Sequence, residues 1–221
     1  MTLALLLPGF APNLYDLGAM LRADRVILQD VESWSRKSRV HRAKIRTAQG
    51  TQWINIPIRT ADKKKPIREV RIDQEEDWVT PILRALRYNY RNSIYYDFYE
   101  PEIRADFESG RDYTYLLPFI EYIRGRLFRF MEVDIQEEYA SELDFYSSDP
   151  DELARHQNAN TLYQEYDARH YQRQAEQFST PHIEHPTYHQ HFEGFEPGCC
   201  ILDVLFQFGP ECFRILASLR D

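Results

Sequence analysis

The sequence has few cysteines and no long apolar run. Its 221 residues include only Cys199, Cys200 and Cys212, of which two are adjacent, and adjacent cysteines bridge only with strain. We therefore expect reduced thiols in a cytoplasmic protein. No stretch approaches the roughly 18 apolar residues of a membrane helix, and the short apolar start lacks the basic residues of a signal peptide. We expect neither membrane insertion nor export.

Glycine-rich phosphate motifs are also absent. The eight glycines form no G-x-G-x-x-G and no G-x-x-x-x-G-K pattern, and there is no G-x-S-x-G nucleophile elbow. These absences exclude a conventional nucleotide hydrolase and a serine esterase. With 43% apolar and 14% aromatic residues, the chain can bury a core, which excludes intrinsic disorder.

Charge is distributed unevenly along the chain. The net charge is −8, yet the segment from Arg22 to Arg71 holds 14 Lys and Arg against 5 Asp and Glu, and the remaining residues hold 13 against 30. An anionic partner is therefore compatible with the acidic average, provided that it binds the basic segment.

Hydrophobic periodicity predicts a single α/β domain over residues 1–221, with a mixed sheet and covering helices. The first thirty residues have a strand–helix–strand pattern, in which Asn13 caps the helix between strands at 3–7 and 25–28. Alternation over 52–58 and 70–72 predicts a half-buried hairpin. Further helices are expected after Asp77, over 116–130, from Pro150, over 166–178, and in the apolar C-terminal segments 199–206 and 213–216.

The segment from Arg36 to Arg46 carries six Lys and Arg residues in eleven positions. Guanidinium groups suit phosphate or carboxylate, because the planar fork can donate two hydrogen bonds to one oxyanion. One alternative is a solvated face that pairs with the acidic remainder of the chain. RNA binding is a minor alternative, since the rest of the surface would repel a polyanion and makes nucleic acid an unfavourable partner.

Four histidines lie within ten residues: His182, His185, His189 and His191. Their spacing matches no standard metal site, Pro186 interrupts helical geometry, and no cysteine lies at ligand spacing. We expect hydrogen-bonded or exposed loop histidines, with no metal and no cofactor.

An aromatic run extends from Tyr88 to Tyr99. Such rings can stack on a sugar or a base. Near a helix end they more often pack in the core and at its rim, which is the interpretation we adopt.

Motifs spread over nearly the whole chain match a known family. They occupy 23–30, 38–45, 50–58, 67–73, Trp78, Tyr90 with the aromatic residues after it, 185–190 and 195–209. The His-Pro-x-Tyr-x-Gln element at 185–190 and the Ile-Leu-Asp-x-Leu-Phe-x-x-Gly element at 201–209 are specific in combination. On these residues the sequence resembles the WbqC-like proteins, a bacterial family met in O-antigen and other surface-polysaccharide gene clusters.

The resemblance implies a transferase of surface-polysaccharide biosynthesis, with an aminoacyl group, glycine in particular, transferred to a sugar. The implied substrate is a small anion, either a nucleotide sugar or an activated acyl donor. We expect its phosphate to bind the basic segment and a general base to act on it. The residues assigned to substrate binding are Arg36, Arg39, Arg42, Lys44, Tyr188 and Gln190, and those assigned to catalysis are Asp30 and His185.

Three motifs typical of the family are altered here. Leu6-Leu7-Pro8 stands where relatives open with His-Gln-Pro, and His41-Arg42-Ala43 where they have Asn-Arg-Asn. Their Tyr-Leu-Ser-Gly appears as Tyr163-Gln-Glu-Tyr, without the glycine. These departures support a second hypothesis, a non-catalytic relative that keeps an anion pocket and has lost the ancestral activity.

Overall fold

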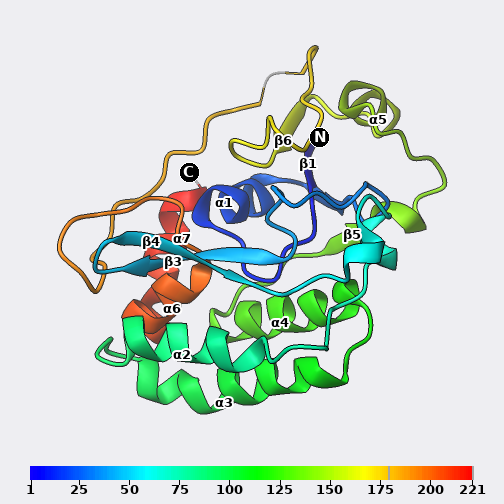
Figure 1. Cartoon of the computed structure of the whole chain (residues 1–221). Coiled ribbons are helices and arrows are strands. Elements are labelled where there is room, and N and C mark those ends of the chain that lie inside the picture. Colours follow the sequence, from blue (N-terminus) through cyan, green and yellow to red (C-terminus); the bar gives the residue numbers. More distant parts are fainter. Residues whose placement is uncertain (179, 221) are drawn as a thin grey trace.

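Four parallel strands form the central sheet of the computed structural model, which describes residues 1–178 and 180–220 (Figure 1). In spatial order they are β5 (Glu137–Tyr139), β2 (Arg25–Leu28), β1 (Thr2–Leu6) and β6 (Thr161–Gln164). Helix α1 (Leu14–Arg22) connects β1 to β2, and the Asn13 side chain accepts a hydrogen bond from Asp16 N at its start. The expected α/β class and strand–helix–strand start are confirmed.

Both faces of the sheet are buried. Leu3 and Leu5 of β1 pack with Ile27 and Leu162 in a small apolar cluster beside α5 (Pro150–His156). The alternate residues Ala4, Leu6, Val26 and Leu28 belong to the main core. Successive residues of these strands point to opposite faces of the sheet, and the residues on both faces are apolar. This is typical of a parallel sheet that is covered on both faces.

The hairpin forms between strands other than the predicted pair. β3 (Arg42–Thr47) pairs with β4 (Gly50–Asn55) in an antiparallel ladder, whereas Ile58 and Ile72 meet only in an isolated bridge. β3 also alternates, with Ala43 and Ile45 buried between charged residues, but two apolar positions give a weaker strand signal than the three isoleucines at 54, 56 and 58.

Three helices pack below the hairpin in Figure 1: α2 (Val79–Tyr90), α3 (Tyr96–Ser109) and α4 (Leu116–Phe130). The predicted helices after Asp77, over 116–130 and from Pro150 are confirmed, while α3 was not predicted. Within the aromatic run, Tyr90, Tyr96 and Tyr99 are buried as expected of packing residues.

The helix predicted over 166–178 is wrong. The structure places no helix or strand between β6 and residue 199 among the residues it describes. The Asp151 carboxylate instead accepts the backbone N–H groups of Glu176, Gln177 and Phe178. A side chain distant in sequence therefore provides the acceptors that a helix would have supplied.

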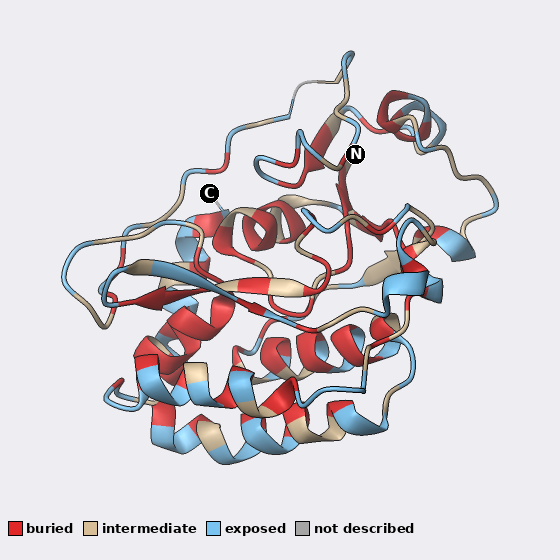
Figure 2. Cartoon of the chain, viewed as in Figure 1, coloured by how far each residue is buried: buried red, intermediate tan, exposed pale blue. Residues whose placement is uncertain are grey.

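Two apolar helices close the chain, α6 (Ile201–Phe208) and α7 (Phe213–Arg220). Figure 2 shows buried residues throughout β1 and α6 and on one side of α2, α3 and α4. All three cysteines are buried and free. In the part of the chain that the structure describes, no helix combines the length and the apolar character needed to cross a membrane.

The turn after α6 predicts a sharp difference between two glycine substitutions. Gly209 has a φ of +49°, and a Cβ there would lie 2.6 Å from the ring of Tyr95. We expect Gly209→Ala to lower the free energy of unfolding by about 1–3 kcal/mol, because the added methyl group overpacks the turn and strains its backbone. Urea unfolding followed by circular dichroism measures it.

Gly125→Ala in α4 is the matched control. A Cβ at Gly125 meets no atom within 4 Å, so the substitution should leave stability unchanged or raise it by about 0.5–1 kcal/mol. Equal losses in the two variants would contradict the packing assigned to Gly209.

Candidate functional site

The carboxyl ends of β1 and β6 mark the place where the chain changes direction across the sheet. From β1 the chain adds β2 and then β5 on one side, and β6 joins on the other side. In open parallel sheets, ligands bind in the crevice where the loops diverge at such a point. Here those loops are residues 7–13 after β1 and the segment that begins at Glu165 after β6.

A buried charge cluster occupies this switch point. Arg39 Nη2 lies 3.1 Å from Asp16 Oδ2, and Arg39 Nε lies 3.7 Å from Glu165 Oε1. Burial raises the pKa of Asp16 despite the nearby guanidinium, and burial raises the pKa of Glu165 to about 8. One positive charge therefore serves two carboxyl groups, and the Glu165 carboxyl is largely protonated at neutral pH.

The cavity at this cluster is small. It measures about 30 Å³ and is lined by Leu6, Leu7, Arg39 and Glu165, among others. That volume accommodates a water-sized molecule and is far below that of a nucleotide pocket. The two leucines are the residues that stand in place of the His-Gln pair of the resembled family, so this departure lies directly at the switch point.

Arg124 of α4 holds the loop after β1 in place. Its guanidinium is buried, pairs with the Glu137 carboxylate at 2.7 Å and donates to Gly9 O at 2.8 Å. A buried charge is stable only when it is paired and hydrogen-bonded. The pair thereby joins α4, β5 and the loop that lines the cavity.

A larger groove lies between the loop after β2 and the hairpin. It measures about 390 Å³ and is lined by Trp34, Arg36, His41, Arg42, Trp53, Asn55 and residues 56–58. The Arg42 guanidinium lies 4.3 Å from the centre of the Trp53 ring, and its Nε donates to Ser38 O at 3.0 Å. Arg42 is thereby held in place by a backbone contact and an aromatic face.

The two arginines of this groove have no acidic partner. Neither Arg36 nor Arg42 forms an ion pair with any residue that the structure describes, whereas Arg39, Arg71 and Arg124 do. Burial and the positive charges of Arg39 and Arg36 lower the pKa of Arg42, although Tyr171 opposes the shift. An excess of positive charge in a groove favours an anionic ligand.

His41 adds a neutral ring to the groove. Burial and the charge of Arg42 lower the pKa of His41 to about 4. Trp34 Nε1 donates to His41 Nδ1 at 3.2 Å, which places the remaining ring proton on Nε2. The imidazole therefore contributes a hydrogen bond without adding charge.

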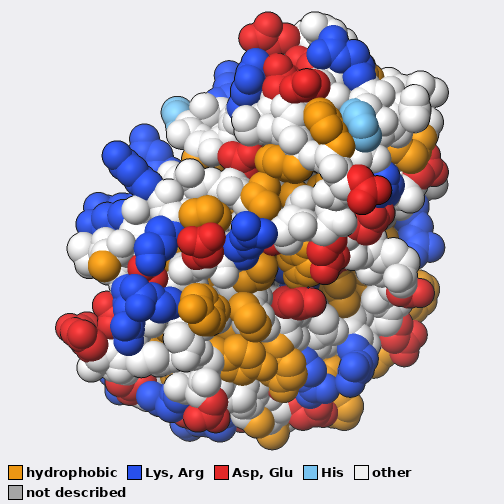
Figure 3. Space-filling view, turned by 90° about the vertical axis from the view of Figure 1, so that its right-hand side faces the viewer, with side chains coloured by type: hydrophobic (Ala, Val, Ile, Leu, Met, Phe, Trp, Pro, Cys, Tyr) orange, Lys and Arg blue, Asp and Glu red, His pale blue; other side chains and the backbone are white. Residues whose placement is uncertain are grey.

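Charges of both signs are interspersed on the surface. In Figure 3, several Lys and Arg side chains lie along the left edge of the displayed face, other Lys, Arg, Asp and Glu side chains lie around the remaining edges, and hydrophobic side chains gather in its middle.

The predicted anion-binding residues divide between three places. Arg36 and Arg42 share the groove, and Arg39 belongs to the charge cluster. Lys44 donates to Pro197 O at 3.1 Å, away from both. The basic segment therefore offers two arginines at one groove rather than a continuous cationic surface.

The two predicted catalytic residues lie outside the groove and form hydrogen bonds within the protein. The buried Asp30 carboxylate accepts from Ser141 N at 3.0 Å and from Ser141 Oγ at 2.6 Å. His185 Nε2 accepts from Gly198 N at 3.1 Å, so its Nδ1 donates to Pro186 O at 2.9 Å. Burial lowers the pKa of His185. Among the described residues, the groove that Arg42 lines includes neither Asp30 nor His185.

Tyr188 and Gln190 contribute to a buried hydrogen-bond network around Asp203. The Asp203 carboxylate accepts from Tyr90 OH at 2.9 Å, Tyr188 OH at 2.8 Å and Gln190 Nε2 at 3.1 Å. Arg46 Nε donates to Gln190 Oε1 at 3.1 Å. Burial raises the pKa of Asp203. The two sequence elements that are specific in combination, at 185–190 and 201–209, thus meet at one carboxylate.

Sequence reasoning missed Asp16, Glu165 and Trp53 as site residues. Asp16 lies in the first predicted helix, and Glu165 lies in the altered motif that begins at Tyr163. Asp16 is 23 positions and Glu165 is 126 positions from Arg39 in the sequence, so no local pattern predicts these contacts. Along β4, the side chain of Trp53 lies on the opposite face of the strand from Gln52 and Ile54. Strand alternation in the sequence could therefore have indicated that Trp53 is exposed, and in the structure it is 37% exposed.

The histidine segment forms no metal cluster in the residues described. Within 1–178 and 180–220, no three His, Cys, Asp or Glu side chains gather closely enough to hold a metal ion. His182 and His189 are exposed.

Comparison with known proteins gives one family and one curated relative. The model of the WbqC-like protein family matches residues 8–215. A Mycobacterium tuberculosis protein, named only as "Uncharacterized protein Rv1507c", is 32% identical over 83 residues, which cover 37% of this chain and 35% of that relative. The matched part thus spans about a third of the relative's length. No solved structure matches the chain.

The charge cluster predicts a characteristic dependence of stability on pH. The Glu165 carboxyl has a pKa of about 8 in the folded chain and about 4.3 when unfolded. Its neutral form therefore stabilises the fold below about pH 4, and this contribution is lost as pH rises to about 8. We expect Glu165→Gln to raise Tm more at pH 8 than at pH 5, as measured by thermal unfolding in matched buffers.

Glu142→Gln provides the control, because Glu142 is exposed and forms no ion pair with the described residues. Its Tm difference from the parent should be flat with pH. A flat difference for Glu165→Gln would contradict a neutral carboxyl in the cluster.

Proposed function

The chain belongs to the WbqC-like protein family, and from this premise and the groove geometry we propose that it binds a small anionic substrate of bacterial surface-polysaccharide biosynthesis. The substrate is a nucleotide sugar or an activated acyl donor, bound at Arg42. The observation that carries the proposal is the pair Arg36 and Arg42, which lines a groove of about 390 Å³ and forms no ion pair with the residues that the structure describes.

The groove offers the two kinds of contact that a nucleotide diphosphate needs. Arg42 uses Nε and Nη2 on the carbonyls of Ser38 and Lys37, which leaves its other N–H groups for phosphate oxygens. Trp53 provides an aromatic surface beside the guanidinium, on which a flat base can pack. Because Arg42 is already held against Trp53, little ordering of that side chain opposes binding.

In the transferase form of the proposal, a sugar hydroxyl attacks the carbonyl carbon of an activated aminoacyl donor, glycyl in particular. An ester bond to the sugar forms, the bond to the donor's carrier group breaks, the carrier leaves with the bonding electron pair, and the hydroxyl proton passes to a general base. Asp30 and His185 are then the candidate general bases. His185 would have to exchange a hydrogen bond made within the protein for one made to substrate, since both of its nitrogens have partners. Each Asp30 oxygen accepts one hydrogen bond and keeps a lone pair for a substrate proton.

The second candidate function is binding without turnover. Three observations favour it: Leu6 and Leu7 line the switch-point cavity, that cavity is only about 30 Å³, and the two candidate bases lie outside the groove. In this form the chain holds the same anion at Arg42 and lacks the acid–base chemistry.

RNA binding is the weakest form of the proposal. Lys44 and Arg46 donate hydrogen bonds to residues of the 188–197 segment, and Arg39 pairs with acids. Only Arg36 and Arg42 face the groove, which suits a small anion better than the several successive phosphates of a polymer.

Isothermal titration with a uridine-diphosphate sugar tests the anion groove. We expect Arg42→Ala to weaken binding by roughly tenfold or more, because a charge-assisted hydrogen bond contributes about 1.5–3 kcal/mol. Arg91→Ala, which removes an exposed arginine outside the groove, should bind like the parent. Parent-like affinity in Arg42→Ala would place the ligand elsewhere.

Trp53→Ala separates the aromatic contact from the ionic one. We expect it to weaken binding of the nucleotide sugar while leaving the affinity for inorganic pyrophosphate within about twofold, since pyrophosphate has no ring to stack. Equal losses for the two ligands would show that Trp53 acts only by supporting Arg42.

A turnover assay distinguishes the two candidate functions. The transferase form requires formation of a glycylated sugar from a glycyl donor and a sugar acceptor. This activity should be lost in His185→Ala and retained in His182→Ala, since His182 is an exposed histidine of the same segment. The binding form requires ligand binding by calorimetry with no product from any donor tested.

A further inference from the structure

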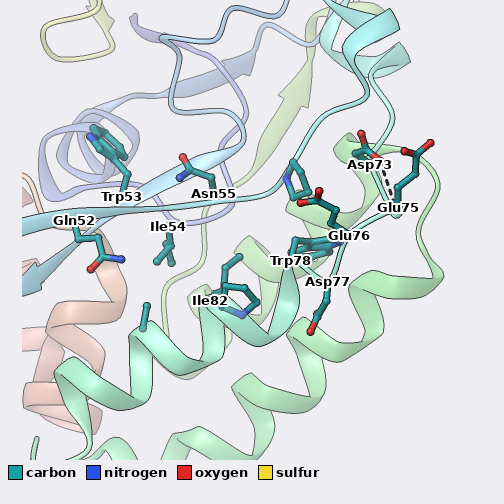
Figure 4. A pocket seen from close by; sticks show the side chains of 13 residues that line it. Gln52, Trp53, Ile54, Asn55, Asp73, Glu75, Glu76, Asp77, Trp78 and Ile82 are labelled. Carbon is teal, nitrogen blue, oxygen red and sulfur yellow. Dashed lines mark hydrogen bonds between the residues drawn. The ribbon is translucent and has the colours of Figure 1, made fainter.

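A second groove runs along the hairpin, between β4 and α2 (Figure 4). It measures about 370 Å³. One wall is β4 itself, from Gln52 to Asn55, and the opposite wall is the start of α2 with the segment that leads into it. In Figure 4, Ile54 and Ile82 point toward one another across the groove, whereas Trp53 and Asn55 project to the other side of the strand.

The strand that forms this wall has a free edge. β4 pairs with β3, and no other described strand pairs with it. Ile56 N donates to His41 O at 2.8 Å, and bonded and non-bonded residues alternate along an antiparallel ladder. The N–H and C=O groups of Trp53 and Asn55 therefore point away from β3, along the edge that lines the groove.

The groove is apolar inside and acidic at one end. Its apolar lining consists of Ile54, Pro57, Trp78, Pro81, Ile82 and Ala85. The segment before α2 supplies four carboxylates, Asp73, Glu75, Glu76 and Asp77, and the described residues that line the groove include no Lys or Arg. Asp77 is paired with Arg111 at 2.9 Å, while Glu75 and Glu76 are exposed and form no ion pair with the described residues.

We propose that this groove binds an extended basic peptide segment of a partner protein, which adds as a third strand along β4. Backbone hydrogen bonds to Trp53 and Asn55 supply the register. An apolar peptide side chain beside Ile54 packs on Ile82 and Ala85, as strand alternation requires. A neighbouring Lys or Arg lies against Glu75 and Glu76, and this charge complementarity selects a basic segment over an acidic one.

Fluorescence anisotropy with a labelled Lys-Val-Lys-Val-Lys-Val peptide tests the proposal on the full chain. We expect saturable binding that is weakened by about tenfold or more when alternate peptide nitrogens are methylated, since methylation removes the donors of strand pairing and keeps the charge. The Glu-Val-Glu-Val-Glu-Val peptide should not bind. Methylated peptide that binds as tightly as the parent peptide would overturn strand addition.

Two matched double variants test the acidic end. Glu75→Lys with Glu76→Lys should weaken binding about tenfold, whereas Glu142→Lys with Asp144→Lys changes the net charge equally at exposed sites outside the groove and should leave it unchanged. If both double variants bound the peptide equally weakly, overall charge alone would explain the effect, and the proposed site would be wrong. Circular dichroism confirms that each variant is folded.

Asn55→Pro removes one edge donor without touching the ladder to β3, because Asn55 N–H points outward. It should weaken binding of the Lys-Val-Lys-Val-Lys-Val peptide, and circular dichroism confirms that the variant is folded. Light scattering completes the test: a dimer of the parent chain that Asn55→Pro dissociates would assign the edge to a second copy and overturn the peptide partner.

Discussion

The burial of one carboxylate constrains the architecture around the hairpin. Asp203 lies in an apolar helix with no exposed surface, where an unpaired carboxyl would cost several kcal/mol. Its three donors come from α2 and from the irregular 185–199 segment. Tyr90 OH also accepts from Arg46 N of β3. A single buried acid thus fixes the positions of α2, α6, β3 and a long segment that has no regular secondary structure of its own.

The hairpin consequently has one bound strand and one open strand. β3 is held by Tyr90 through Arg46 and by the 190–199 segment through Lys44 and Arg46. β4 pairs with β3, and Ile54 is buried facing α2, whereas no other strand among the described residues pairs with β4. The open strand separates two grooves of opposite charge, one basic at Arg42 and one acidic at Glu75. Trp53, Asn55 and Pro57 line both.

Local signals in the sequence were enough for the elements that depend on short-range physics. The β1–α1–β2 start follows from Asn13 and from alternation, and α4 and α5 follow from helical spacing and an Asp-Pro start. The helix α3 escaped prediction because Pro101 lies inside it and aromatic residues dominate its first turn. The error at 166–178 has a different cause, since Asp151 captures the backbone donors of that segment from outside.

The site was predictable only in its chemistry. Charge counting located the basic segment, and the structure shows that only Arg36 and Arg42 of it line the groove. Which arginines have no acidic partner depends on where Asp16 and Glu165 lie in space. The order of strands in the sheet determines those positions. Tyr188 and Gln190 were expected to bind substrate, and the structure places both with Asp203 in one buried hydrogen-bond network. Spacing alone could not show that this network is buried.

The sheet order also determines how the chain must fold as it is made. β1 is a central strand whose second neighbour, β6, begins at Thr161. During synthesis from the N-terminus, the edge of Thr2–Leu6 therefore stays unpaired while more than half of the chain emerges. An unpaired apolar strand edge is a template for association with other chains. The edge of β1 therefore remains available for association with other chains until residues 161–164 leave the ribosome.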